Sequence, residues 1–104
     1  MKEFALNHEQ MPWEEAAGYP TGTMMKVLRQ EGDQKTFLLK LPAGFAIEAH
    51  CHTSVAEQHL VLRGSYVAQG TAYSAGSYRC IPPGVTHGPF TSDEGAELLV
   101  IWGA

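Results

Sequence analysis

Two histidines in the segment GFAIEAHCHTSVAEQHLVLRG, residues 44–64, are separated by one cysteine, and a glutamate follows after four further residues. On a β-strand, residues i and i+2 face the same way, so His50 and His52 would project from one face and Cys51 from the other. Glu57 comes after a short loop and could open the next strand, facing the same space. Two imidazoles and a carboxylate suit iron, and also manganese, zinc, nickel or copper. The spacing therefore predicts a site for one divalent metal ion and leaves its identity open.

Two further histidines could take part in the chemistry of this site. His87 follows the turn Pro82-Pro83-Gly84, in which the prolines fix φ and the glycine can adopt positive φ. Such a turn can set where the next strand begins and so place one ligand. His59, two residues after Glu57, should face inward on the same strand. It could orient Glu57 or a substrate, move a proton near neutral pH, or be a core histidine bonded to a backbone carbonyl.

Short strands must position these side chains. The chain has 104 residues, and its 11 glycines and 6 prolines are spread between short apolar segments at roughly ten-residue spacing. This pattern predicts one all-β domain, a sandwich or barrel, with a helical turn only at residues 13–17. The predicted strands are residues 24–29, 35–41, 45–52, 58–62, 65–69, 78–81 and 96–102.

The charge pattern excludes several classes of partner. Lys and Arg total 7 against 11 Asp and Glu, which gives a net charge of −4 without any basic cluster. A nucleic-acid or anionic-membrane partner is therefore not expected. The first fifteen residues have no apolar signal segment, and no apolar run approaches membrane-spanning length. We expect a cytoplasmic protein whose two cysteines, Cys51 and Cys80, are reduced thiols.

The outer face of the predicted barrel is unusually apolar. Leu60 and Leu62 would face away from Glu57 and His59, and the segment ELLVIW, residues 97–102, shows no alternation. An apolar outer face needs a cover, either the N-terminal segment or a second subunit. We therefore expect a homodimer.

Other side chains have simpler interpretations. Arg79 could bind a carboxylate substrate if it faced inward, but we expect it to face solvent. Cys51 should be a packed core thiol, and nothing near Cys80 would lower its pKa and make it a nucleophile. Five aromatic residues could line a pocket or only fill the core: Phe45, Tyr66, Tyr78, Phe90 and Trp102.

The two histidine segments resemble the paired motifs of the cupin family. The first motif is a glycine, five residues, HxH, three or four residues, a glutamate, six residues and a glycine. Gly44, His50, His52, Glu57 and Gly64 match every position.

The second motif is a glycine, five residues, PxG, two residues, a histidine, three residues and an asparagine. Gly76, Pro82, Gly84 and His87 match, and Thr91 replaces the asparagine. The asparagine is not a usual ligand in the family, so this departure puts little in doubt about metal binding.

The resemblance implies a jelly-roll barrel, also called a double-stranded β-helix. Residues 1–104 would form one cupin domain with an N-terminal arm at residues 1–22, a first motif at 44–64 and a second at 76–91. It also implies a single divalent metal ion inside the barrel, held by His50, His52, Glu57 and His87. Within the family, the chain is most similar to the cupin modules of zinc-binding anti-sigma factors and small aromatic-ketone dioxygenases.

Two functions are compatible with such a site. In an enzyme of the dioxygenase, isomerase or lyase type, the open positions of the metal would bind an enediol, diketone or hydroxyketone, with the metal acting as a Lewis acid and His59 moving a proton. In a binding or sensing module, the metal would stabilise a barrel that holds a small molecule. A sensor would need a separate partner, because we identify no effector or DNA-binding segment in these residues. This favours the enzyme.

Overall fold

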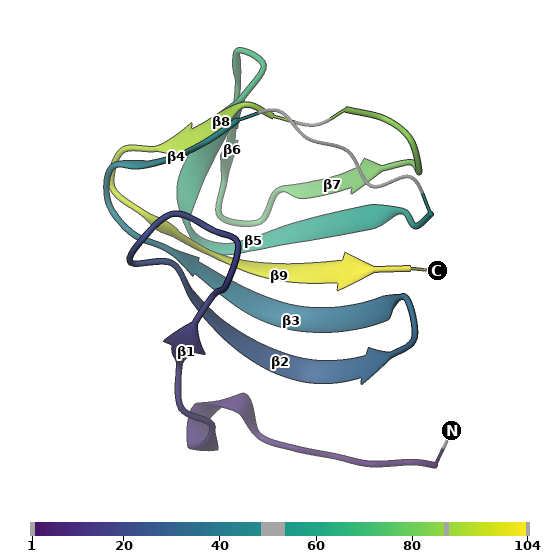
Figure 1. Cartoon of the computed structure of the whole chain (residues 1–104). Helices are drawn as coiled ribbons and strands as arrows, with labels where there is room; N and C mark the ends of the chain where they lie inside the picture. The colour runs from purple at the N-terminus through teal and green to yellow at the C-terminus, as the bar shows by residue number, and fades with distance from the viewer. Residues whose placement is uncertain (1, 49–53, 87, 104) are drawn as a thin grey trace.

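A computed structural model describes residues 2–48, 54–86 and 88–103, and almost all of their regular structure is β-strand (Figure 1). These residues contain one 3₁₀ turn, η1 (His8–Gln10), and no helix long or apolar enough to cross a membrane. The strands are β1 (Glu14–Glu15), β2 (Met24–Glu31), β3 (Gln34–Leu41), β4 (Phe45–Ile47), β5 (Glu57–Ala68), β6 (Thr71–Ser74), β7 (Tyr78–Ile81), β8 (Phe90–Ser92) and β9 (Ala96–Trp102).

The strands form one antiparallel sheet that curls over on itself. Strands follow the order β1-β2-β3-β9-β5-β8-β4, and β6 and β7 also pair with β5. In Figure 1, β2, β3, β9 and β5 lie side by side as a curved layer, and β4, β6 and β8 close over one end of it. The order joins strands distant in the chain, as a jelly roll requires. The predicted all-β cupin fold is therefore confirmed.

Strand β5 connects the two layers. Its first half pairs with β9 and β7, and its second half pairs with β6 and β8. Between them, the register with β9 shifts at residues 61–63, and Gly64 has a φ of 71°. A Cβ at Gly64 would collide with the carbonyl oxygen of Gly95, so only glycine fits here. The predicted division into separate strands at 58–62 and 65–69 is thus wrong, because a bulge bends one continuous strand.

Three other sequence predictions differ from the structure. Residues 13–17 do not form a helical turn, because Glu14–Glu15 pairs with β2 as a short strand and the helical turn lies earlier, at His8–Gln10. Strands β6 and β8 were not predicted, because TAYS and FTS are too short and polar to show a strand pattern. Strand β4 covers only Phe45–Ile47 of the predicted 45–52, whose last four residues lie outside the described ranges.

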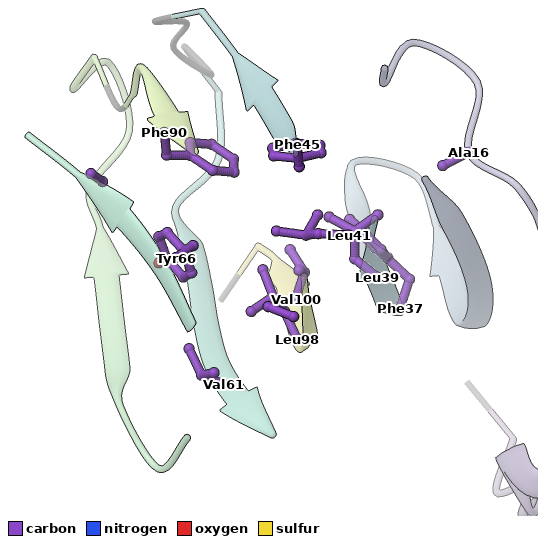
Figure 2. Close-up of a cluster of buried hydrophobic side chains, with 12 residues drawn as sticks. Ala16, Phe37, Leu39, Leu41, Phe45, Val61, Tyr66, Phe90, Leu98 and Val100 are labelled. Atoms are coloured by element: carbon purple, nitrogen blue, oxygen red, sulfur yellow. The ribbon is translucent and has the colours of Figure 1, made fainter. Parts of the chain in front are cut away.

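The core lies between the layers. Alternate residues of β3 and β9 face inward, with Phe37, Leu39 and Leu41 opposite Leu98 and Val100 (Figure 2). Phe45 and Phe90, from β4 and β8, stack with ring centroids 5.5 Å apart and cover the same cluster. Each large apolar side chain buried here contributes about 1.5–3 kcal/mol to folding. This cluster fixes the layer on which the candidate site is built.

The N-terminal arm covers part of the outer face. The Lys26 Nζ donates to the His8 carbonyl at 2.7 Å and lies 4.6 Å from the centroid of the Trp13 ring, so the arm is held over β2. Farther along the sheet, Leu62 remains 42% exposed on β5. The homodimer stays a prediction.

Candidate metal centre

Strand β5 places Glu57 and His59 on the inner face of the sheet. Glu57 begins the strand, and the two side chains are only 6% and 2% exposed. Gln58 and Leu60, between and after them, are more exposed and point to the other face. The expected position of Glu57 at the start of a strand is therefore observed.

The pairing register shows which side chains share a row with these two residues. Across β3, β9, β5 and β7, Phe37, Val100, His59 and Arg79 lie opposite one another in turn. In the next row, Trp102, Glu57 and Ile81 are partners. Rows that begin with apolar side chains on β3 or β9 therefore continue with a polar side chain, His59 or Glu57, on β5.

Glu57, His59 and Tyr66 form a buried hydrogen-bonded chain. The His59 Nε2 lies 2.5 Å from the Glu57 Oε2, and the His59 Nδ1 lies 2.8 Å from the Tyr66 hydroxyl. A carboxylate can only accept, so Nε2 carries a hydrogen that it donates to Glu57. The imidazole thus holds the carboxylate in one orientation.

Arg79 extends this chain to the next strand. Burial raises the pKa of the Tyr66 hydroxyl, whereas a hydrogen bond from the Arg79 guanidinium and its positive charge lower it. In the bond between Tyr66 and His59, either the hydroxyl or the Nδ1 can donate, depending on the tautomer of His59. We call Glu57, His59, Tyr66 and Arg79 the polar strip.

The prediction that Arg79 faces solvent is wrong. Its Cζ lies 5.2 Å from the centroid of the Tyr73 ring, which in turn stacks on Tyr66 at 5.2 Å. The Arg79 Nη1 is buried and has no hydrogen-bond partner among the described residues. The sequence could not reveal this orientation, because four residues of β7 with mixed polarity do not fix which face is inward.

Tyr19 is a second residue that sequence reasoning missed. It lies in the loop between β1 and β2 and packs against the core cluster. Burial raises the pKa of its hydroxyl well above the usual value, and the negative charge of Glu57 raises it further. The loop therefore brings a phenol within electrostatic reach of the candidate ligand. Nothing in the turn-rich segment around Tyr19 distinguishes it from an ordinary connection.

The predicted aromatic residues divide into two groups. Tyr66, Phe45 and Phe90 are buried inside, and Trp102 lies next to Glu57 in its row and packs edge-on against the core. Tyr78, by contrast, is 59% exposed and donates to the Gln58 side chain on the outer face.

Three of the four predicted ligands, His50, His52 and His87, lie outside the described residues, as does Cys51. Within the described ranges, no three His, Cys, Asp or Glu side chains form a group that could hold a metal. Cys80 is exposed on β7 as a free thiol. The turn expected before His87 is present, because Gly84 has a φ of 76° and the Val85 amide donates to the Pro82 carbonyl.

Glu57 itself fits a metal ligand. It is a carboxylate enclosed in the barrel, and an imidazole that is hydrogen-bonded elsewhere holds it in place. Divalent metals bind hydrogen-bonded carboxylates of this kind. The bond from His59 would fix the orientation of the Glu57 carboxylate as a ligand. The donor chemistry at this position is therefore compatible with the four-ligand set that the sequence predicts.

Comparison with solved structures shows the same fold in several proteins. An RmlC-like cupin from Ralstonia eutropha matches 100% of this chain and 70% of its own, with a TM-score of 0.82 and 21% identity. An acetylacetone dioxygenase from Acinetobacter johnsonii matches 98% of this chain and 74% of its own, with a TM-score of 0.83 and 15% identity.

The anti-sigma factor ChrR of Rhodobacter sphaeroides, solved in complex with SigE, matches at a TM-score of 0.71 and 23% identity. That match covers 92% of this chain but only 51% of the matched chain, so this chain spans about half of it. No curated protein matches the sequence.

The family profile described as ChrR cupin-like domain matches residues 1–104. Cupins generally bind a metal ion, which agrees with the enclosed Glu57 carboxylate. The jelly-roll topology and the full-length match lead to one conclusion: the chain belongs to the ChrR cupin-like family of cupins.

Proposed function

We propose that this chain binds one divalent metal ion through His50, His52, Glu57 and His87 and is a small metalloenzyme of the dioxygenase type. Its substrate would be a small enediol, diketone or hydroxyketone. The observation that carries the proposal is the enclosed Glu57 carboxylate on the inner face, hydrogen-bonded to His59.

The burial of this carboxylate supports a metal. An ionised carboxylate inside a barrel is costly unless opposite charge or strong hydrogen bonds compensate for lost hydration. His59 contributes a hydrogen bond to Glu57. A divalent ion would add opposite charge at the carboxylate itself. When bound, such an ion polarises substrate oxygens, and a redox-active one also permits chemistry with dioxygen.

The residues around Glu57 would orient groups and hold a proton. His59 fixes the Glu57 carboxylate through Nε2 and shares a hydrogen bond with the Tyr66 hydroxyl at Nδ1. The proton of that bond is held inside the barrel between two side chains of β5. The apolar neighbours Val100 and Phe37 continue the same row and exclude water from it. The strip can therefore retain a proton close to a substrate without exposing it to solvent.

The comparison with the acetylacetone dioxygenase supports the choice of substrate class. That protein has the same barrel fold over nearly the whole of this chain, and at this low identity the likeness is one of fold. A diketone can bind a metal through both of its oxygens. A metal site with its protein ligands on one side would leave two open positions for them.

A second candidate is a metal-stabilised module that binds a partner or small molecule without catalysis. The family is named after ChrR, and the matched region of ChrR comes from a complex with SigE. In this case the ion would be held in a closed site and would contribute mainly to folding.

Metal analysis of the purified protein tests both candidates. We would measure metal per chain for the wild type, Glu57→Gln and His87→Ala, with Glu94→Gln, an exposed carboxylate, as the matched control. The enzyme predicts about one iron, manganese, nickel or copper per chain that the two ligand variants lose and the control keeps. Such a result would justify oxygen-uptake assays with diketones and hydroxyketones.

Other results would favour the alternative or overturn both. Tightly bound zinc whose removal only lowers Tm would favour the module. Absence of any metal, even after anaerobic reconstitution with each ion in turn, would overturn the four-ligand site itself.

A further inference from the structure

We propose that Arg79 binds a carboxylate group of the ligand inside the barrel, next to Glu57 and His59. This inference rests on the proposed function and extends its substrate class to small molecules that carry a carboxylate. The ligand would be a small keto acid or hydroxy acid, with one end at the metal and an anionic end at Arg79.

The strand register places Arg79 beside His59. Arg79 is the direct partner of His59 across the β5–β7 ladder, so both side chains lie on the inner face. Neighbouring strands are about 4.8 Å apart, and Glu57 is one inward position along β5 from His59. A molecule of four to six heavy atoms could therefore extend from the Glu57 end to Arg79.

Among the described residues, the Arg79 guanidinium has a hydrogen-bond donor and a positive charge without a partner. A guanidinium has five N–H donors and always carries a positive charge. Its positive charge acts on the Tyr66 hydroxyl, and its Cζ lies 5.2 Å from the centroid of the Tyr73 ring. The Nη1 is buried without a hydrogen-bond partner, and no carboxylate within the described residues forms an ion pair with Arg79.

A buried donor that lacks a partner is unfavourable, and more so when it is charged. A bound ligand is one source of the acceptor that such a group needs. Glu57, the buried carboxylate of the polar strip, pairs with His59. The missing acceptor is thus expected to come from a bound molecule.

The shape of the site points to a carboxylate. Tyr66 and Tyr73 stack with a 24° angle between their planes, and the guanidinium lies over the second ring. These rings place the guanidinium before a ligand arrives. A planar guanidinium matches the two coplanar oxygens of a carboxylate better than it matches a neutral carbonyl.

A matched pair of ligands tests the proposal. Acetoacetate and acetylacetone have the same skeleton, but one carries a carboxylate where the other has a methyl ketone. We would measure Kd for both by isothermal titration calorimetry on metal-loaded wild type, Arg79→Gln, Arg79→Lys and the control Arg63→Gln, an exposed arginine at the bend of β5. The metal content of every sample is measured in parallel.

We expect the wild type and Arg63→Gln to prefer acetoacetate by about 10- to 100-fold, as a charge-assisted hydrogen bond provides. Arg79→Gln should lose this preference while its metal content and acetylacetone affinity stay unchanged. Arg79→Lys keeps the charge but loses the paired N–H donors of the guanidinium, so it should retain part of the preference for acetoacetate.

The same preference in Arg79→Gln as in the wild type would overturn the proposal, as would a fully metal-loaded wild type that binds neither ligand or binds both equally. Failure of the proposed function looks different, because the wild type would then contain no metal. In that case the metal-free protein still tests Arg79, since acetoacetate should raise the Tm of the wild type but not that of Arg79→Gln.

Discussion

The inner face of the curved sheet contains two regions that share strand register and burial but differ in chemistry. On β3 and β9, Phe37, Leu98 and Val100 are fully enclosed hydrocarbon. On β5 and β7, the row of Phe37 and Val100 continues with His59 and Arg79. Burial stabilises the first region without any partner, whereas the second depends on hydrogen bonds and charge. The first region therefore holds the fold, and the second contains the site that we propose.

Truncation in the apolar region should have the largest effect on folding. Leu98 is 0% exposed and belongs to the central strand β9. We expect Leu98→Ala to lower the free energy of unfolding by about 2–5 kcal/mol, because it removes buried methyl groups and leaves a cavity. Urea denaturation followed by circular dichroism would measure this. Leu62→Ala, on the exposed outer face, is the matched control and should cost far less. Equal costs for the two variants would contradict the division into regions.

The apolar region was also the easier one to predict from the sequence. Strands at 24–29, 35–41, 78–81 and 96–102 were found within a few residues, because β-branched and leucine residues cluster there between turn residues. The two halves of β5 were separated wrongly, since Arg63-Gly64-Ser65 has the composition of a turn. Only the close approach of the Gly95 carbonyl reveals why a glycine is needed inside a strand.

The polar strip was only partly predictable. The inward positions of Glu57 and His59 follow from strand alternation, and the structure shows them in contact. Tyr66 was found as an interior aromatic, but its hydrogen bond to His59 depends on the bend in β5. The orientation of Arg79 was predicted wrongly and Tyr19 was missed, because their positions depend on the register of a short strand and on the path of a loop. Neither property is encoded in local composition.

Removal of the central imidazole should have an intermediate effect. His59→Ala would remove the hydrogen bonds that His59 makes with the Glu57 carboxylate and the Tyr66 hydroxyl. We expect the metal-free protein to lose about 1–3 kcal/mol of stability. Metal affinity should fall by about 10- to 100-fold, because the carboxylate is no longer oriented.

Chemical denaturation of the metal-free protein and competition with a chromogenic chelator would measure these two quantities. His8→Ala, on the exposed N-terminal arm, serves as the control. Tyr66→Phe should show a smaller loss of metal affinity than His59→Ala, since the bond to Glu57 remains. An unchanged metal affinity in His59→Ala would show that His59 is only a core histidine.

The smallest effect at neutral pH is expected for Tyr19→Phe, and it should grow only in alkali. The pKa of Tyr19 is raised in the folded protein, first by burial and then by the charge of Glu57. Above about pH 10 the unfolded chain releases this proton while the folded chain keeps it, so stability falls as pH rises. One such group lowers the free energy of unfolding by about 1.4 kcal/mol per pH unit, and Tyr19→Phe should remove this contribution. Urea denaturation of both proteins from pH 7 to 11 measures the slope, and the constant difference below pH 9 is the internal control. Parallel curves throughout would mean that Tyr19 ionises freely and that the loop does not enclose the polar region as it encloses the apolar one.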